Sequence, residues 1–388
     1  MSSPVATVDA GVTGTEALLE LLRRGVHHLP VVRGGELAGV VTPTDLQPSR
    51  RIGPQALYKR IEVAGGAAEL STYADDIADM VQHLHNSRLA ATDIGRVVAA
   101  LGDALAVRLL TLAEADLGRP PCAYAWIVFG SEGRREQSLL TDQDNALIYA
   151  EATEEAADYF RALAERVVGD LLAVGIPPCA GGFMATHWCR PLAQWSRLFR
   201  SWIDEPEPEA LLEAANFFDF RSLAGGLDTG PLEEIIGAAA DRRLFLAQMA
   251  KTGLEKRPPL GLLHRIRESP EGVDLKAGAL MPILALARLS ALEAGERRGS
   301  TLQRLEAAAR AGTLSEEGAD LLASAFRFVF DVRLRQQLAD RRAGRDPSHH
   351  VQLGDLSAVE RSHLKQAFIS ISQIQDAVAD RFAAHHLG

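Results

Sequence analysis

The sequence has few cysteines, fewer basic than acidic residues and no long hydrophobic run, and each shortage excludes a class of protein. Three cysteines in 388 residues (Cys122, Cys179 and Cys189) give no even-numbered disulfide framework, so we expect reduced thiols. Lys and Arg number 41 against 51 Asp and Glu, a formal net charge of −10. That balance argues against a sequence-independent grip on nucleic acid, which needs basic residues to neutralise phosphates.

Targeting and membrane-spanning segments are not evident either. The first residues lack the basic and then apolar layout of a signal peptide. The most apolar later run, residues 280–292, is short and interrupted by Arg288. Hydrophobic residues at 47% and charged residues at 24% are ordinary for a globular chain with room for two or three domains. We therefore expect a cytoplasmic protein that binds neither membrane nor nucleic acid.

Residues 126–149 carry the clearest chemical pattern, WIVFGSEGRREQSLLTDQDNALIY. The apolar run at 126–129 predicts a buried strand, which turns at Gly130 and Ser131 into a charged segment. A Gly-Ser turn before a helix leaves backbone N–H groups to hold an anion. Arg134 and its neighbour Arg135 follow closely enough to reach phosphate oxygens, which suit guanidinium groups.

Two aspartates lie in the second strand-like run of this stretch. Side chains two apart in a strand share a face, so we expect Asp142 and Asp144 side by side, with Gln143 facing away. Paired carboxylates repel unless a cation neutralises them, and Mg²⁺ prefers oxygen ligands. Either motif alone is common at turns and strand ends. Together on consecutive strands they indicate phosphoryl or nucleotidyl transfer.

This stretch resembles the Gly-Ser…Asp-x-Asp signature of the polymerase-β-like nucleotidyltransferase superfamily. Within it, GSEGRREQSLLTDQDNALIY is similar to nucleotidyltransferases joined to CBS domains, which in turn resemble the protein-PII uridylyltransferases. The resemblance implies an α+β fold with a mixed sheet, Mg²⁺ as cofactor and a nucleoside triphosphate (ATP or UTP) as substrate. By it, Gly130, Ser131 and Arg134 would hold the phosphates, and Asp142 and Asp144 would hold the metal and serve catalysis.

Residues 1–48 predict a small α/β unit. A helix at 15–24 ends at Gly25, a natural C-cap, and strands at 28–32 and 37–42 flank a Gly-Gly turn. The run HHLPVVRGGELAGVVTPTDL resembles the end of a CBS motif, in which Thr44 and Asp45 would hold an adenine nucleotide.

CBS motifs normally work in pairs, and this sequence shows a single one. Either its partner lies outside the chain, or two chains each supply one half and form a homodimer. A docking or dimerisation element without ligand is the other interpretation.

Glycine and proline residues that interrupt the helical patterns divide the rest of the chain into three predicted regions. Residues 51–118 predict a helical linker, with amphipathic helices at 73–89 and 91–117. Residues 119–228 would form the nucleotidyltransferase-like domain, and residues 229–388 a helical C-terminal domain for substrate or partner. Two segments there, VDLKAGALMPILALARLSALEAG and FRFVFDVRLRQQL, resemble the helical domain attached to this family.

A third carboxylate, which many polymerase-β-like enzymes add from a later strand, is missing where it is expected. No Asp or Glu occurs between Asp170 and Asp204. The strand predicted over 182–187 offers only Thr186 and His187, of which His187 is a candidate base.

The next acidic residue in a suggestive setting is Asp219. It would either bind metal or pair with Arg221 or another neighbour. An aromatic stripe at helical spacing precedes it and predicts core packing: Trp195, Phe199 and Trp202.

These patterns favour a Mg²⁺-dependent nucleotidyltransferase that moves an NMP group from an NTP to a protein side chain. The CBS unit would regulate it in signal transduction by sensing adenine nucleotides. The missing carboxylate keeps open a non-catalytic nucleotide-binding module, and a structural scaffold would bind no nucleotide.

Overall fold

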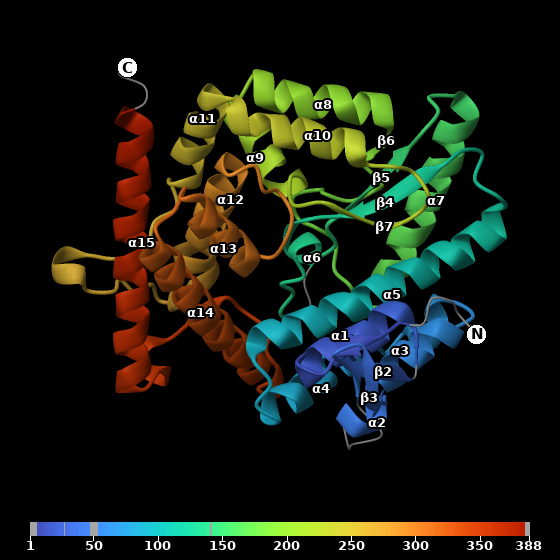
Figure 1. Cartoon of the computed structure of the whole chain (residues 1–388), viewed down its shortest axis with the longest axis horizontal. Coiled ribbons are helices and arrows are strands. Elements are labelled where there is room, and N and C mark those ends of the chain that lie inside the picture. Colours follow the sequence, from blue (N-terminus) through green and yellow to red (C-terminus); the bar gives the residue numbers. More distant parts are fainter. Residues whose placement is uncertain (1–5, 27, 47–52, 140–141, 385–388) are drawn as a thin grey trace. The chain divides into compact units, whose positions relative to one another are not determined.

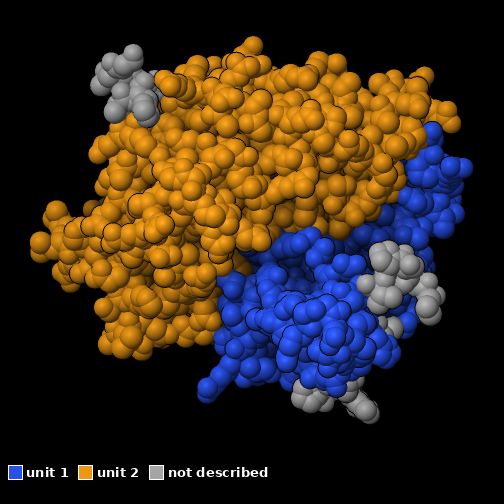
Figure 2. Space-filling model, viewed as in Figure 1, with its two compact units in different colours: residues 1–121, 135–143, 158–187 blue, residues 122–134, 144–157, 188–388 orange. Residues whose placement is uncertain are grey.

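The computed structural model describes residues 6–26, 28–46, 53–139 and 142–384. The chain forms two compact units (Figure 2). Unit 1 contains residues 1–121, 135–143 and 158–187, and unit 2 contains residues 122–134, 144–157 and 188–388. Helices dominate and the sheets are small, so the α+β class predicted from the sequence is confirmed (Figure 1).

Unit 1 begins with a three-stranded sheet and two helices: β1 Val8–Asp9, α1 Gly14–Arg24, β2 Leu29–Arg33, β3 Glu36–Val41 and α2 Pro43–Leu46. The central strand β2 pairs parallel with β1 and antiparallel with β3. Thr13 and Glu16 form a capping box at the start of α1, and Gly25 ends it in the left-handed conformation with φ 60°. The predicted helix, its glycine cap and the predicted hairpin are therefore confirmed.

The helices that follow in unit 1 are α3 Pro54–Val63, the 3₁₀ turn η1 Ala67–Leu70, α4 Tyr73–Asn86 and α5 Ala91–Leu117. Helices α1, α3 and α4 all pack against α5, whose buried face includes Ile94, Leu101 and Leu105. The apolar positions of α5 recur three and four residues apart and form a continuous buried stripe, against which the three helices pack. The helices predicted over 73–89 and 91–117 are confirmed. Helix α7 (Glu154–Ala173) begins in unit 2, and most of its length belongs to unit 1.

Unit 2 is built on a mixed sheet of order β6-β5-β4-β7: β4 Tyr124–Val128, β5 Asn145–Tyr149, β6 Cys189–Pro191 and β7 Arg221–Ala224. Strand β4 is antiparallel to β5 and β7, and β5 is parallel to β6. Every residue of β4 and β5 is buried. Two expectations are corrected. The second strand begins at Asn145, so the aspartates precede it, and residues 182–187 form turns instead of a strand.

Aromatic side chains fill the core beside this sheet. Helices α8 (Leu192–Asp204) and α9 (Pro208–Phe217) bring Trp195 within 5.1 Å of Phe217 and Phe199 within 5.6 Å of Phe218, measured between ring centroids. Trp195 and Phe199 are fully buried. The core role predicted for the aromatic stripe is confirmed.

The rest of unit 2 is mainly helical. Its helices are α6 Gly130–Arg134, α10 Gly230–Ala238, α11 Arg243–Gly253, α12 Met281–Glu293, α13 Thr301–Ala311, α14 Glu316–Arg342 and α15 Ala358–Ala384. Short elements join them: η2 Ala239–Asp241, η3 Leu262–His264, β8 Val273–Asp274, η4 Lys276–Leu280, β9 His350–Val351 and η5 Leu353–Asp355. Within the described ranges, none of the helices combines the length and apolar content needed to cross a bilayer.

Candidate active site

The corner after β4 lies directly against one of the predicted metal ligands. The Phe129 N–H donates to the backbone oxygen of Asp144 at 3.1 Å. The next residue, Gly130, has φ 58°, a conformation that favours glycine. A Cβ at Gly130 would lie 2.5 Å from Oδ2 of Asp144. The corner and the Asp144 carboxylate therefore touch, and a side chain at position 130 would separate them.

A second glycine, Gly133, seats the short helix α6 and was not singled out from the sequence. A Cβ there would come within 2.2 Å of the backbone oxygen of Asp219, so only glycine permits this approach. The guanidinium of Arg221 donates to the Glu132 backbone oxygen at 3.2 Å and holds α6 from the other side. The signal in the sequence was the second glycine of GSEG. Ser131, between the two glycines, is half-buried.

Asp142 belongs to unit 1, in the loop before β5. The residue after it, Gln143, is 2% exposed, and its backbone N–H and side-chain amide donate to Pro177 and Ile176 oxygens at 3.0 and 3.3 Å. Asp142 and Asp144 are each half-buried. The expected alternation, with the aspartates on the accessible side and Gln143 turned inward, is thus present although the strand starts later.

A cysteine also lies near Asp142 within unit 1. A carboxylate oxygen of Asp142 and the sulfur of Cys179 are within 4.8 Å. Cys179 is a free, half-buried thiol. A thiol is a soft ligand and Mg²⁺ is a hard ion, so this sulfur does not suit magnesium. Carboxylates suit Mg²⁺, and only Gln143 separates Asp142 from Asp144 in the chain, so their joint role as metal ligands stays a prediction.

Asp219 is the centre of a buried ion-pair cluster in unit 2. Its side chain is fully buried and pairs with Arg134 of α6, Arg288 of α12 and Arg304 of α13. Arg288 donates through Nε and Nη2 at 3.1 and 2.7 Å. Burial alone would raise the pKa of Asp219, but the three guanidinium groups hold it well below its usual range.

This cluster settles two expectations about Asp219. Three cations already neutralise its carboxylate, so a metal-ligand role is wrong. The alternative interpretation, that Asp219 forms an ion pair instead of binding metal, is confirmed with three arginines as its partners, and Arg221 donates to the Glu132 backbone oxygen. Arg134, predicted to assist the phosphates, is 8% exposed and joins α6 to the C-terminal helices through Asp219.

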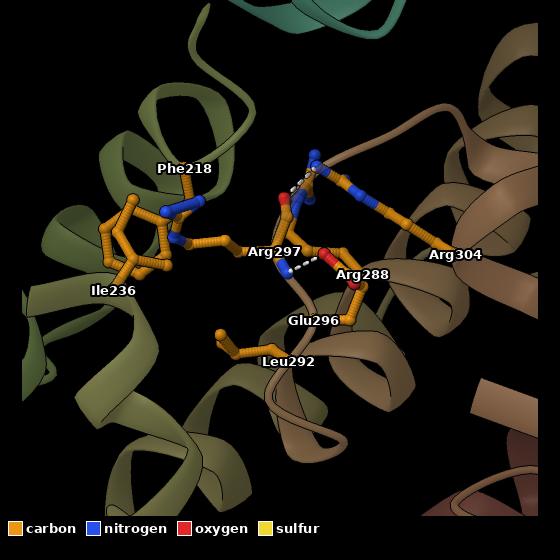
Figure 3. Close-up of a pocket in the computed structure, with 7 residues that line it drawn as sticks. All are labelled: Phe218, Ile236, Arg288, Leu292, Glu296, Arg297 and Arg304. Atoms are coloured by element: carbon orange, nitrogen blue, oxygen red, sulfur yellow. Dashed lines mark hydrogen bonds between the residues drawn. The ribbon is translucent and has the colours of Figure 1, made fainter. Parts of the chain in front are cut away.

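The space beside the cluster is too small for a nucleotide (Figure 3). It has a volume of about 10 Å³, room for at most one water. Arg304 crosses it to donate to the backbone oxygen of Arg297 at 2.9 Å, and Glu296 accepts from the Arg297 N–H at 3.0 Å. Arg288 also lines this space, and three apolar side chains complete its walls: Phe218, Ile236 and Leu292. The cluster is therefore a structural junction.

The CBS-like unit places Asp45 at the start of α2. Oδ2 of Asp45 accepts from the backbone N–H and the hydroxyl of Thr42 at 2.8 and 2.6 Å, and these bonds lower its pKa. Its other oxygen, Oδ1, makes no hydrogen bond to a described residue, and the side chain is exposed. The side chain of Thr44 lies outside the described part of the structure.

Comparison with known families matches three parts of the chain. Residues 75–209 match the family described as "Putative nucleotidyltransferase DUF294", and residues 243–382 match its "Putative nucleotidyltransferase substrate binding domain". Residues 1–47 match the CBS domain. A search of curated proteins found no match. The three matches occur in the order that the sequence suggested, and the chain therefore belongs to the CBS-domain-linked nucleotidyltransferase family.

Proposed function

We propose that this chain transfers an NMP group from a nucleoside triphosphate, ATP or UTP, to a protein side chain, with Mg²⁺ as the metal. The observation that carries the proposal is the contact between the left-handed Gly130 corner and the Asp144 carboxylate. It brings backbone N–H groups suited to phosphate beside a carboxylate suited to the metal of a metal–nucleotide complex.

The chain's own groups have separate tasks in this reaction. The backbone at Gly130 and the hydroxyl of Ser131 bind phosphate oxygens. Asp142 and Asp144 would hold Mg²⁺, which supplies positive charge for the pyrophosphate leaving group. The acceptor's nucleophilic atom bonds to the α-phosphorus, the bond to the pyrophosphate oxygen breaks, and the acceptor's proton passes to a base. His187, an exposed residue of unit 1, is our candidate for that base.

The test is nucleotide labelling in cell extract. Wild-type protein with Mg²⁺ and α-labelled ATP, UTP, CTP or GTP should label a protein band, and Asp142→Asn with Asp144→Asn should lower that labelling by at least about 100-fold. The matched control, Glu154→Gln with Glu155→Gln, removes two exposed carboxylates from the first turn of α7. It should label like wild type. Equal labelling by the aspartate variant would refute the mechanism.

A non-catalytic nucleotide-binding module is the second candidate. It is favoured by the missing third carboxylate: residues 171–203 contain no acid, and Asp219 is held by three arginines. Such a protein should bind Mg²⁺–NTP saturably, lose that binding on Asp142→Asn with Asp144→Asn, and label nothing. The same assay, with an equilibrium binding measurement added, separates the two functions.

Regulation through the CBS-like unit completes the proposal. Oδ1 of Asp45 would accept a hydrogen bond from a ribose hydroxyl of an adenine nucleotide. Separately, the unit would form a homodimer through the exposed edge of its three-stranded sheet. Strand β3 is the edge of that sheet, with Leu37 67% and Val40 49% exposed. An exposed edge strand with apolar side chains invites pairing with another chain. Adenine nucleotide should bind wild type and bind Asp45→Ala at least about tenfold more weakly; equal binding would exclude this role.

A further inference from the structure

The C-terminal part of unit 2 contains a second candidate binding site, with residues separate from those of the Gly130 corner. It is a cavity of about 350 Å³, within the range of small-ligand sites. Its walls come from the start of an arm after α11, from the π-helical turn η4 and from strand β9. The arm is the gold loop beside α15 in Figure 1, to which it is tied by a hydrogen bond from Gln375 to the Lys256 backbone oxygen at 2.8 Å.

The backbone around this cavity is held in place from several sides. The arm folds back on itself: Gly261 N–H donates to Arg265, and Arg267 N–H donates to Pro259, both at 2.7 Å. A Cβ at Gly278 of η4 would lie 2.8 Å from the ring of Pro259. At Gly272, with φ 107°, a Cβ would lie 2.6 Å from the Val351 oxygen. These close approaches fix the walls, so the cavity does not depend on side-chain positions alone.

The lining carries an excess of positive charge. Lys256, Arg257 and Arg267 face a single lining carboxylate, that of Asp274, and the ring of His350 also lines the cavity. Among the described residues, Lys256 and Arg267 form no ion pair, whereas Arg257 is shared with Asp376 of α15. Lys256, Arg257 and Arg267 are all exposed, so their charges combine at the cavity into a local positive potential that attracts anions, although the whole chain has a net charge of −10.

We propose that this cavity binds a small phosphate ester. A phosphate dianion matches cations that approach from separate walls, and guanidinium and ammonium groups are the side chains that bind it most strongly. The carboxylate of Asp274, at the end of β8, accepts the Ala277 N–H of η4 at 2.9 Å, which fixes its orientation. Its negative charge repels an anionic ligand and so lowers the affinity of the site for one. The site is independent of the proposed transferase chemistry, although it lies in the region that matches a substrate-binding domain.

The experiment is isothermal titration of the full-length protein with glycerol phosphate, inorganic phosphate, succinate and glycerol, without Mg²⁺ and at about 50 mM salt to limit screening. Lys256→Ala with Arg267→Ala should weaken binding of glycerol phosphate at least tenfold. The matched control, Lys251→Ala with Arg265→Ala, removes the same two side-chain types from exposed positions outside the cavity and should bind like wild type. Asp274→Asn, which keeps an acceptor oxygen, should bind several-fold more tightly.

Two further outcomes decide the assignment. Asp142→Asn with Asp144→Asn should leave glycerol phosphate binding unchanged, because those residues belong to the proposed nucleotide site at the Gly130 corner and do not line this cavity. If that variant lost binding while Lys256→Ala with Arg267→Ala kept it, the phosphate would be bound at the corner and the proposal would be wrong. Tighter binding of succinate than of glycerol phosphate, or no saturable binding by wild type, would also overturn it. None of these results depends on NMP transfer.

Discussion

The two principal sheets of this protein differ in how much of their surface the chain itself covers. In unit 2, all residues of β4 and β5 are buried beneath helices and aromatic side chains. In unit 1, five of the six residues of β3 are exposed, although the strand contains Leu37 and Val40. Both sheets are made of short apolar strands. The chain itself covers the apolar surface of the unit 2 sheet, whereas the unit 1 sheet has an exposed apolar edge suited to pairing with another chain.

Unit 2 also contains a buried charge cluster, formed between its helices. Asp219 follows α9 directly and reaches three arginines from three different helices, away from water. Ion pairs gain strength when solvent is excluded, but each buried charge then depends on its partners. The cluster therefore links α6, which begins at the Gly130 corner, to the C-terminal helices α12 and α13.

The largest effect is expected from breaking this cluster. Asp219→Asn leaves three buried guanidinium groups without their counter-charge, and we expect a loss of about 3–5 kcal/mol in the free energy of unfolding. All four tryptophans of the chain (Trp126, Trp188, Trp195 and Trp202) lie in unit 2, so urea denaturation followed by tryptophan fluorescence reports on this unit. Asp241→Asn, at an exposed position, is the control and should change stability little. If Asp219→Asn lowered the free energy of unfolding by less than about 1 kcal/mol, the cluster would not contribute substantially to the stability of unit 2.

A matched pair of leucines tests the difference between the sheets directly. Leu147 in β5 is fully buried, and Leu37 in β3 is 67% exposed. Leu147→Ala should cost about 2–5 kcal/mol because it opens a cavity in the core. Leu37→Ala should change the stability of the monomer by less than about 0.5 kcal/mol. Circular dichroism during urea denaturation, at a concentration where the protein is monomeric, measures both. Similar losses at the two positions would contradict the contrast between a covered and an open sheet.

Much of this fold could be predicted from local sequence patterns. Helices at 73–86 and 91–117, the Gly25 cap and the hairpin around the Gly-Gly turn follow from periodicity and turn chemistry that act over a few residues. The strand before Gly130 was equally clear because all of its residues are apolar. Each of these features is decided by neighbours in the chain, which a sequence displays directly.

The features that the sequence did not reveal depend on contacts between distant segments. Asp219 is 85 residues from both Arg134 and Arg304, and nothing near it in the chain indicates those partners. Gly133 is required because the Asp219 backbone passes close to it, again a long-range contact. Residues 182–187 have a composition that suits either a strand or a turn, so the predicted strand is wrong and the segment forms turns. The roles of Asp142 and Asp144 remain predictions for the labelling experiment.

A smaller effect is expected where the open sheet meets its proposed partner. Val40→Asp puts a charge at an exposed apolar position of β3, and it should weaken homodimerisation at least tenfold while leaving the monomer folded. Sedimentation over a range of protein concentrations measures the dissociation constant. Val12→Asp, at an exposed position outside the sheet in the same unit, should leave that constant unchanged. Dimers of unaltered strength in Val40→Asp would place the interface elsewhere.

The smallest effect concerns the pH dependence of unit 2, which contains a half-buried histidine beside two cationic side chains. The Nδ1 atom of His349 accepts from Arg333 Nε at 3.1 Å, and burial together with the Arg333 and Lys276 charges lowers the pKa of His349 to about 4. The unfolded chain takes up a proton near pH 6.5, which the folded protein does not accept until about pH 4. Stability is therefore complete above pH 6.5 and falls as the pH is lowered toward 4.

Because His349 is only half-buried, solvent screening reduces the change to about 1 kcal/mol between pH 7.5 and pH 5. His349→Asn keeps an acceptor for Arg333 without a titrating ring, so its stability should depend less steeply on pH across that interval. Tryptophan-monitored urea denaturation at the two pH values gives the comparison, with His28→Asn, an exposed residue beside the open sheet, as the control. An unchanged slope in His349→Asn would mean that the acid sensitivity of unit 2 arises from other groups, such as the carboxylates paired with its arginines.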